Sequence, residues 1–134
     1  MKVFWGGGRS PHGKKMETVS KQTAPVLEKT YQFVLWLVPM VDKFPRSQKY
    51  LVGDRIQTAA MDVLDHLIEA AYSRDKLALL NRANLQLEKL RYLFRLAFDL
   101  RIMDMRRYEI SARALDEIGR MVGGWRKANN VLQA

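Results

Sequence analysis

Apolar residues recur every three or four positions from about residue 23 to the end of the chain, which is the spacing of an amphipathic α-helix. Short polar or proline-containing breaks divide this pattern into four predicted helices, over about residues 23–43, 47–72, 77–100 and 105–128. No run of alternating apolar and polar residues competes with them as a strand. Four amphipathic helices joined by short loops predict an all-α fold, an up-down-up-down antiparallel four-helix bundle.

The same spacing predicts which face of each helix is buried, and Pro39 is expected to kink or loosen the last turn of the first helix. The expected core positions of the first helix are Leu27, Tyr31, Val34, Leu37, Val38 and Val41. Those of the second helix are Tyr50, Gly53, Gln57, Ala60, Met61, Leu64, Leu67, Ile68 and Ala71. Those of the third are Leu80, Ala83, Leu87, Leu90, Phe94 and Ala97. Those of the fourth are Tyr108, Ala112, Leu115, Ile118, Val122 and Trp125.

Residues 1–22 differ from the rest of the chain. They contain four of the eight glycines and no apolar periodicity, which predicts a flexible basic tail in front of a bundle domain over residues 23–134. The segment from Gly8 to Lys15 nearly matches the phosphate-binding loop G-x-x-x-x-G-K-[ST]. Lys15 stands where that loop needs a hydroxyl for magnesium, and no α/β sheet is expected behind it, so we predict no nucleotide site there.

Composition narrows the class of protein. The 134 residues are the size of one domain, and 23 Lys and Arg against 14 Asp and Glu give a net charge of +9 that attracts polyanions. Cysteine is absent, which excludes disulfides, thiolate metal sites and cysteine nucleophiles. The longest apolar run, residues 33–41, is far shorter than the ~20 residues that span a bilayer. We therefore expect a cytoplasmic protein without membrane contact.

One cluster, Asp62, Asp65, His66 and Glu69, resembles a metal site because di-iron bundles use Glu-x-x-His pairs. The cluster lies on the expected polar face of the second helix, and the other histidine of the chain, His12, is in the tail. A solvated face is therefore the favoured interpretation. No Ser/His/Asp set has suggestive spacing either, so we expect no catalytic residue, no metal and no cofactor, in a protein that is not an enzyme.

The positions of the basic residues indicate candidate binding surfaces more clearly than the acidic cluster indicates a metal site. On the fourth helix, one stripe opposite the core consists of Arg106, Arg113, Arg120 and Lys127, seven residues apart. The nearby acidic residues Glu109, Asp116 and Glu117 are expected to neutralise much of this stripe through pairs within the helix, which favours an ordinary solvated face.

The third helix has basic residues on both sides of its apolar seam. Arg82 and Lys89 flank one side, and Arg91 and Arg95 flank the other. These arginines and lysines either pack their stems along the seam or face a partner or a phosphate backbone, and the two interpretations carry equal weight.

The spacing of Gly119 and Gly123, followed by Gly124 and Trp125, also has two interpretations. Either the fourth helix ends at Gly123-Gly124, or the glycines allow close packing against a neighbouring helix or protomer with Trp125 as the anchor.

Three ordered motifs resemble a known family. They are Trp36-Leu37-Val38-Pro39-Met40-Val41-Asp42-Lys43-Phe44-Pro45-Arg46 with Gly53-Asp54-Arg55, then Leu90-Arg91-Tyr92-Leu93-Phe94-Arg95, then Asp116-Glu117-Ile118-Gly119-Arg120-Met121-Val122-Gly123-Gly124-Trp125. Over about residues 26–128 the chain resembles the accessory variability determinant (Avd) proteins of diversity-generating retroelements. Four-helix proteins encoded in intervening sequences of large-subunit ribosomal RNA genes share part of the signature, but the third motif favours Avd.

The resemblance implies a protomer of a ring-shaped barrel, a pentamer, with a positively charged surface. It implies a non-enzymatic partner of a reverse transcriptase that also engages template RNA or RNA–DNA during mutagenic cDNA synthesis. Arg91 and Arg95 are the positions that match the family motif and are expected to bind the partner. The further basic candidates for nucleic-acid or partner contact are Arg46, Lys49, Arg55, Arg82, Lys89, Arg113 and Arg120.

Two function classes remain open at this point. The first is a nucleic-acid-binding accessory protein, and the second is a structural oligomer or protein–protein adaptor of the ribosomal intervening-sequence type. Both predict a homo-oligomer, because the first helix is apolar on more faces between Phe33 and Val41 than one bundle interior covers.

Overall fold

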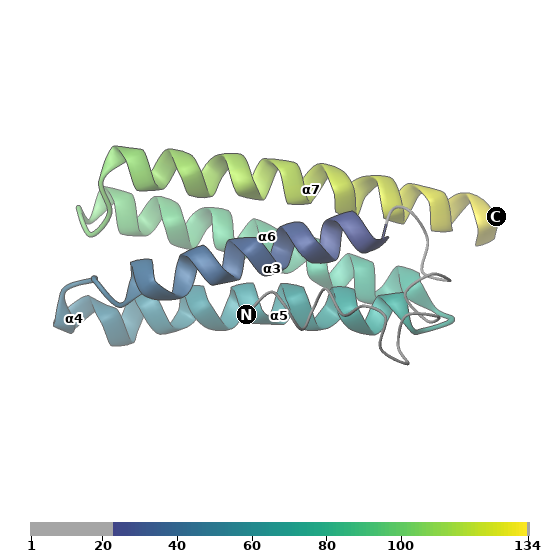
Figure 1. The fold of residues 1–134 in the computed structure, drawn as a ribbon, viewed down its shortest axis with the longest axis horizontal. Coiled ribbons are helices and arrows are strands. Elements are labelled where there is room, and N and C mark those ends of the chain that lie inside the picture. Colours follow the sequence, from purple (N-terminus) through teal and green to yellow (C-terminus); the bar gives the residue numbers. More distant parts are fainter. Residues whose placement is uncertain (1–22, 134) are drawn as a thin grey trace, which may run out of the picture.

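The structure is a computed structural model that describes the backbone of residues 23–133 and the side chains of residues 23–130. Within this range the chain forms four long helices and no strand (Figure 1). The long helices are α3 (Thr23–Val41), α5 (Asp54–Ala71), α6 (Lys76–Asp99) and α7 (Met105–Gln133). A short helix α4 (Arg46–Gln48) and a π-helical turn η2 (Lys49–Gly53) lead into α5. The predicted tail and the near phosphate-binding loop lie outside the described residues.

The long helices surround one core. α3 packs against α5 and α7, α5 packs against α6, and α6 packs against α7, so the helices follow one another around the bundle in chain order. Successive helices run in opposite directions (Figure 1). Phe33 of α3 and Phe94 of α6 meet edge to face across the bundle, with ring centroids 6.0 Å apart. The predicted all-helical four-helix fold is confirmed.

The junction between α3 and α5 depends on one glycine. A Cβ at Gly53 would lie 2.7 Å from the Cγ1 of Val41 and 3.4 Å from the Cδ2 of Phe44, and both of these side chains are buried. Only a residue without a side chain lets the end of α3 pack directly on η2. This contact gives Gly53 a physical role in the first of the three sequence motifs.

The seam of α6 is buried as the sequence predicts, at Leu80, Ala83, Leu87, Leu90, Phe94 and Ala97. On α7, four of the six expected positions are buried: Leu115, Ile118, Val122 and Trp125. Tyr108 and Ala112 are only half-buried, and the buried place between them is taken by a polar residue, Ser111.

The predicted core face of α3 is partly wrong. Leu37 and Val41 are buried as expected, but Tyr31 and Val38 are exposed and Leu27 and Val34 are only half-buried. The buried apolar positions that the prediction missed are Val26, Phe33 and Met40, and two threonines, Thr23 and Thr30, are buried beside them. Apolar residues lie on several faces of this helix, so the helical period is clear while the direction of the core is not.

The predicted core face of α5 is wrong for the same reason. Of the nine expected positions, only Gly53, Ala60 and Leu67 are buried. Tyr50, Met61 and Ile68 are exposed, and Gln57, Leu64 and Ala71 are half-buried. The core is instead supplied by Ile56, Ala59, Val63 and Ala70. Alanines face the core here while larger apolar residues face outward. A prediction that assigns the largest apolar side chains to the core therefore chooses the wrong face.

The helix end predicted at Gly123-Gly124 is wrong, because α7 continues through both glycines to Gln133. It also passes the predicted end near residue 128. A Cβ at Gly123 or Gly124 would meet no atom within 4 Å, so no packing among the described residues depends on them. Contact of these glycines with a neighbouring protomer stays a prediction.

The turn between α6 and α7 contains a non-glycine residue with positive φ, Arg101, at 62°. The Arg101 amide donates to the Phe98 carbonyl (2.9 Å), and the Ile102 amide donates to the Ala97 carbonyl (2.8 Å). These two bonds define a Schellman motif, in which glycine is the favoured residue at the left-handed position. Arg101 therefore adopts a conformation that costs an L-residue free energy.

Candidate nucleic-acid interface

The outer face of α7 carries a stripe of cations. Because Leu115, Ile118, Val122 and Trp125 direct one side of this helix to the core, residues seven apart on the opposite side all face solvent. These residues are exposed, and we call them the α7 stripe: Arg106, Arg113, Arg120 and Lys127. No salt bridge involving any of the four is present among the described residues.

The acidic residues of α7 do not neutralise this stripe, so the expected pairs within the helix are wrong. Asp116 accepts from the Nη1 of Arg91 on α6 at 2.6 Å. Glu117 lies 2.9 Å from the Nζ of Lys29 on α3. The two carboxylates lie on the flanks of α7 and each is closest to a cation of the adjacent helix. The charge of these two carboxylates is used between helices. The third acidic residue, Glu109, is exposed and forms no ion pair among the described residues, so no cation of the stripe is paired there.

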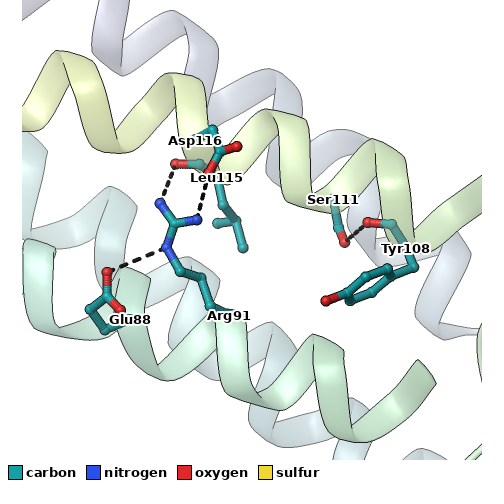
Figure 2. A network of polar contacts seen from close by, with 6 residues as sticks. All are labelled: Glu88, Arg91, Tyr108, Ser111, Leu115 and Asp116. Carbon is teal, nitrogen blue, oxygen red and sulfur yellow. Dashed lines mark hydrogen bonds and ion pairs between the residues drawn. The ribbon is translucent and has the colours of Figure 1, made fainter. Parts of the chain in front are cut away.

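Arg91 joins α6 to α7 (Figure 2). Its Nη1 donates to Asp116, its Nη2 donates to the Leu115 carbonyl at 3.3 Å, and its Nε lies 3.3 Å from the Oε2 of Glu88. A Cβ at Gly119 would lie 3.1 Å from Nη2, so the glycine leaves room for the guanidinium against α7. Of the two interpretations of Arg91, this geometry supports the structural one, and its contact with a partner stays a prediction.

Arg95 lies one turn further along α6 in a different environment. Its side chain is 66% exposed, against 34% for Arg91, and its Nε lies 3.7 Å from Asp99 in a long pair within the helix. An exposed pair of this kind contributes little stability. Arg95 is therefore able to leave Asp99 for a phosphate or a partner carboxylate, whereas Arg91 would have to give up contacts that connect two helices.

Arg55 and Lys89, two further predicted site residues, line one groove between α5 and α6. The groove has a volume of about 640 Å³ and is also lined by Tyr92, whose side chain is largely exposed, and by Leu96. Asp54 and Asp62 line the same groove, so its two cations are balanced by two carboxylates. The exposed ring of Tyr92 is the feature of this groove that suits stacking with a base of a single strand. Arg82 is exposed nearer the start of α6.

Arg46 and Lys49 lie apart from these residues, in α4 and η2 at one end of the bundle (Figure 1). Lys49 donates to the Oδ1 of Asp42 at 2.7 Å. This hydrogen bond lowers the pKa of the Asp42 carboxyl and raises the pKa of the Lys49 ammonium. The charge of Lys49 is thus already paired with Asp42. Because Arg46 and Lys49 lie in α4 and η2, outside the long helices that carry the other candidates, the nine predicted site residues do not form one surface.

The outer face of α5 has the opposite charge. Of its charged residues, four are acidic and one, Arg55, is basic. His66 lies beside this face with its Nδ1 buried, without a hydrogen-bond partner and 3.9 Å from the Oε1 of Glu69. Among the described residues no three acidic or histidine side chains are placed to hold one metal ion.

A pocket lies between α6 and α7 beside Arg91 (Figure 2), and the helical pattern alone does not predict it. The sequence feature that could have indicated it is Ser111, a polar residue in the apolar seam of α7.

None of the described helices is long and apolar enough to cross a membrane.

Comparisons with known proteins agree with the motifs. In structure the chain is similar to a protein of unknown function from the S23 ribosomal protein family of Bacteroides thetaiotaomicron, with a TM-score of 0.74 and 18% sequence identity. The match covers 79% of this chain and 98% of that one, and at this identity it shows the fold alone. No curated protein matches in sequence. The family model described as bAvd-like matches residues 25–129, so the chain belongs to the bAvd-like family.

Proposed function

We propose that this protein is a non-enzymatic accessory factor of the reverse transcriptase of a diversity-generating retroelement, and that it binds template RNA or RNA–DNA during mutagenic cDNA synthesis. The observation that carries the proposal is the bAvd-like match over nearly the whole helical part of the chain. The net charge of +9 and the uncompensated α7 stripe give the physical means of binding a polyanion.

Binding would occur through the phosphate backbone. Neighbouring residues of the α7 stripe are about 10 Å apart along the helix axis, because each residue rises by about 1.5 Å. The stripe is therefore long enough to contact several phosphates of one strand. Exposed arginines suit this role, since the guanidinium stays charged and donates in a planar fork to phosphate oxygens. Arg95 and Lys89 would extend the contact onto α6.

The ring assembly is part of the same proposal. Large apolar side chains are exposed on α3, η2, α5 and α6, among them Leu35, Leu51, Met61 and Leu85. On the described part of α7, only Met105 and Ile110, both in its first two turns, are exposed in this way. Apolar surface on three helices favours contact with further copies. α7 would then face away from those contacts, with its stripe accessible.

A ring needs two different complementary surfaces on each protomer. The acidic outer face of α5 and the basic residues of α6 supply opposite charges on different faces of one bundle. These charges would orient successive copies head to tail, which supports a closed ring of five, the number implied by the resemblance.

The test is binding of the purified full chain to labelled single-stranded RNA at several salt concentrations. We expect the affinity to fall steeply between about 50 and 200 mM salt, because each neutralised phosphate releases counterions. Co-purification with the cognate reverse transcriptase, with and without ribonuclease, then tests the protein partner. Absence of RNA binding at low salt would overturn the nucleic-acid part of the proposal.

A second candidate is a structural oligomer or protein–protein adaptor without a nucleic-acid role. The exposed apolar faces of α3, α5 and α6 favour it, since they need only a protein partner. Light scattering separates the outcomes: a stable oligomer that does not bind RNA at low salt supports the adaptor, and a monomer at micromolar concentration contradicts both candidates.

A further inference from the structure

The pocket between α6 and α7 has a volume of about 290 Å³. Its α7 side is formed by Tyr108 and Leu115, with Ser111 and Ala112 between them. Its α6 side is formed by Glu88, Arg91, Tyr92, Phe94 and Arg95. Arg91 lies at one end of this stretch and Tyr108 at the other, as Figure 2 shows. The space is large enough for one small planar group and too small for a helix or a strand.

The pocket exists because α7 has two small residues, Ser111 and Ala112, where the rest of its core-facing side has large apolar residues. Ser111 occupies the core position one turn before Leu115 and is fully buried. Its hydroxyl donates to the Tyr108 carbonyl at 2.7 Å, so the polar group is satisfied within its own helix and points at no partner on α6. Beside it, Ala112 is half-buried. A leucine at position 111 would continue the seam and fill the space.

The two ends of the pocket present flat groups. The Tyr108 ring is stacked on Phe98, with centroids 4.7 Å apart and an interplanar angle of 21°, which fixes the orientation of the ring beside the pocket. At the opposite end, the Arg91 guanidinium donates through Nη1 to Asp116 and through Nη2 to the Leu115 carbonyl, and its Nε lies 3.3 Å from the Glu88 carboxylate. These contacts hold the guanidinium in place and pair its charge, so its planar face is the surface that it offers to a ligand.

We propose that this pocket takes one unpaired nucleobase of a bound RNA strand, between the face of Arg91 and the ring of Tyr108. This inference rests on the proposed function, since it assumes that RNA lies on the α6–α7 side of the bundle. Unstacked bases are commonly held on aromatic rings and on the planes of arginine side chains. Arg95, which lines the pocket and is largely exposed, would contact the phosphate next to the captured base.

Charge favours a base over an acidic peptide side chain. Glu88 and Asp116 lie at the Arg91 end of the pocket, and Asp99 lies beside Arg95. A carboxylate entering here would meet these anions, and the charge of Arg91 is already paired with Asp116 and Glu88. A neutral base meets no such penalty, and its phosphates stay outside where Arg95 and the α7 stripe supply positive charge.

The test uses Ser111→Leu in the full chain, which fills the pocket without removing any cation. The matched control is Gly123→Leu, which places leucine in a second crevice of α7 of about 300 Å³, also lined by two cations, Arg126 and Lys127, but by no aromatic residue. Each variant is titrated with a labelled single-stranded RNA and, separately, with heparin, a polyanion that has no bases. Thermal unfolding of each variant checks that it is folded.

Position 111 is fully buried, so thermal unfolding shows whether it accepts the larger side chain. We expect folded Ser111→Leu protein to bind the RNA about tenfold more weakly. Its heparin affinity should match that of the wild type, and Gly123→Leu should bind both probes normally. If Ser111→Leu fails to fold, Ala112→Leu fills the same pocket from its half-buried neighbour. If a folded Ser111→Leu protein bound RNA with wild-type affinity, or lost equal affinity for RNA and heparin, the base-binding role of the pocket would be overturned. The proposed function would stay intact. A wild-type protein that binds no RNA would overturn both.

Discussion

α5 and α7 lie on different sides of the bundle, with α3 and α6 between them, and their outer faces have opposite character. α5 carries four acidic residues and one basic residue, together with exposed Met61 and Ile68. α7 carries six basic and three acidic residues, and the cations of its stripe have no acidic partner among the described residues.

The difference shows that the net charge of +9 does not describe a uniformly basic molecule. The acidic and apolar face of α5 suits contact with another protein chain, whereas the basic face of α7 suits a phosphate backbone. The two faces are kept distinct by Arg91 and Lys29, which hold the carboxylates of Asp116 and Glu117 away from the stripe. Four changes to the chain test this division.

The largest effect is expected from reversing the charge of the α7 stripe with Arg113→Glu and Arg120→Glu together. Two phosphate contacts become repulsive, so RNA affinity at about 0.1 M salt should fall about 100-fold, and the slope of log affinity against log salt should shrink by about 1.4. Adding Asp62→Lys and Asp65→Lys on α5 restores the net charge. Recovery of affinity in that fourfold variant would show that total charge matters and the face does not.

The next effect concerns α5. Met61→Ser with Ile68→Ser removes exposed apolar surface that we assign to contact between copies, and should raise the dissociation constant of the oligomer by about tenfold or more. Sedimentation velocity across a concentration series measures this change. The matched control is Met105→Ser with Ile110→Ser on α7, which should leave the oligomer unchanged. Equal weakening by both pairs would contradict the difference between the two faces.

A smaller effect is expected from Arg91→Ala. The loss of its bonds to α7 should lower the free energy of unfolding by about 1 kcal/mol, since the side chain is partly exposed. Asp116 would then be free to pair with Arg113 or Arg120 on its own helix, so RNA affinity should fall a few-fold. Adding Asp116→Asn should restore the part of the affinity that the α7 stripe supplies, but neither the stability nor the contact between Arg91 and a base.

Arg95→Ala serves as the control for that experiment, and its unfolding free energy should stay within about 0.5 kcal/mol of the wild type. The measurement is chemical denaturation of both variants side by side. If Arg91→Ala and Arg95→Ala were equally stable, Arg91 would not be the contact between α6 and α7 that the geometry indicates.

The smallest effect is expected at the end of the bundle, away from both faces. Arg101→Gly should raise the free energy of unfolding by about 0.5–1 kcal/mol, because glycine adopts the positive φ of this turn without strain. Arg101→Ala removes the same charge but keeps the strain. Both variants should bind RNA with an affinity within about twofold of the wild type. The difference between their melting temperatures then measures the cost of the positive φ at position 101.

Periodicity predicted α6 well because its apolar residues form one narrow stripe, and all six expected core residues are buried. It failed on α3 and α5, where apolar side chains occur on several faces and some are exposed in this structure. Leu35 and Met61 are as hydrophobic as the buried Leu37 and Val63, so no local property of the sequence separates them.

The candidate site was predictable in its residue types but not in its arrangement. The seven-residue spacing of the α7 stripe was visible in the sequence, and the structure keeps it exposed. The pairing of Asp116 with Arg91 joins residues 25 positions apart, and that of Glu117 with Lys29 joins residues still further apart. Sequence spacing favours pairs within one helix, and here the geometry of the bundle overrides that preference.

By itself, the sequence determined that this protein is helical, that it forms four long helices, and that it carries an excess of positive charge. These properties follow from the local period of apolar residues and from composition. The tertiary structure decided which apolar face meets the core, which carboxylates leave the α7 stripe free, and that Ser111 opens a pocket beside Arg91. The reason is physical: a helix forms from contacts three and four residues apart, whereas its rotation and its ion pairs are set by neighbours that the chain reaches only after folding.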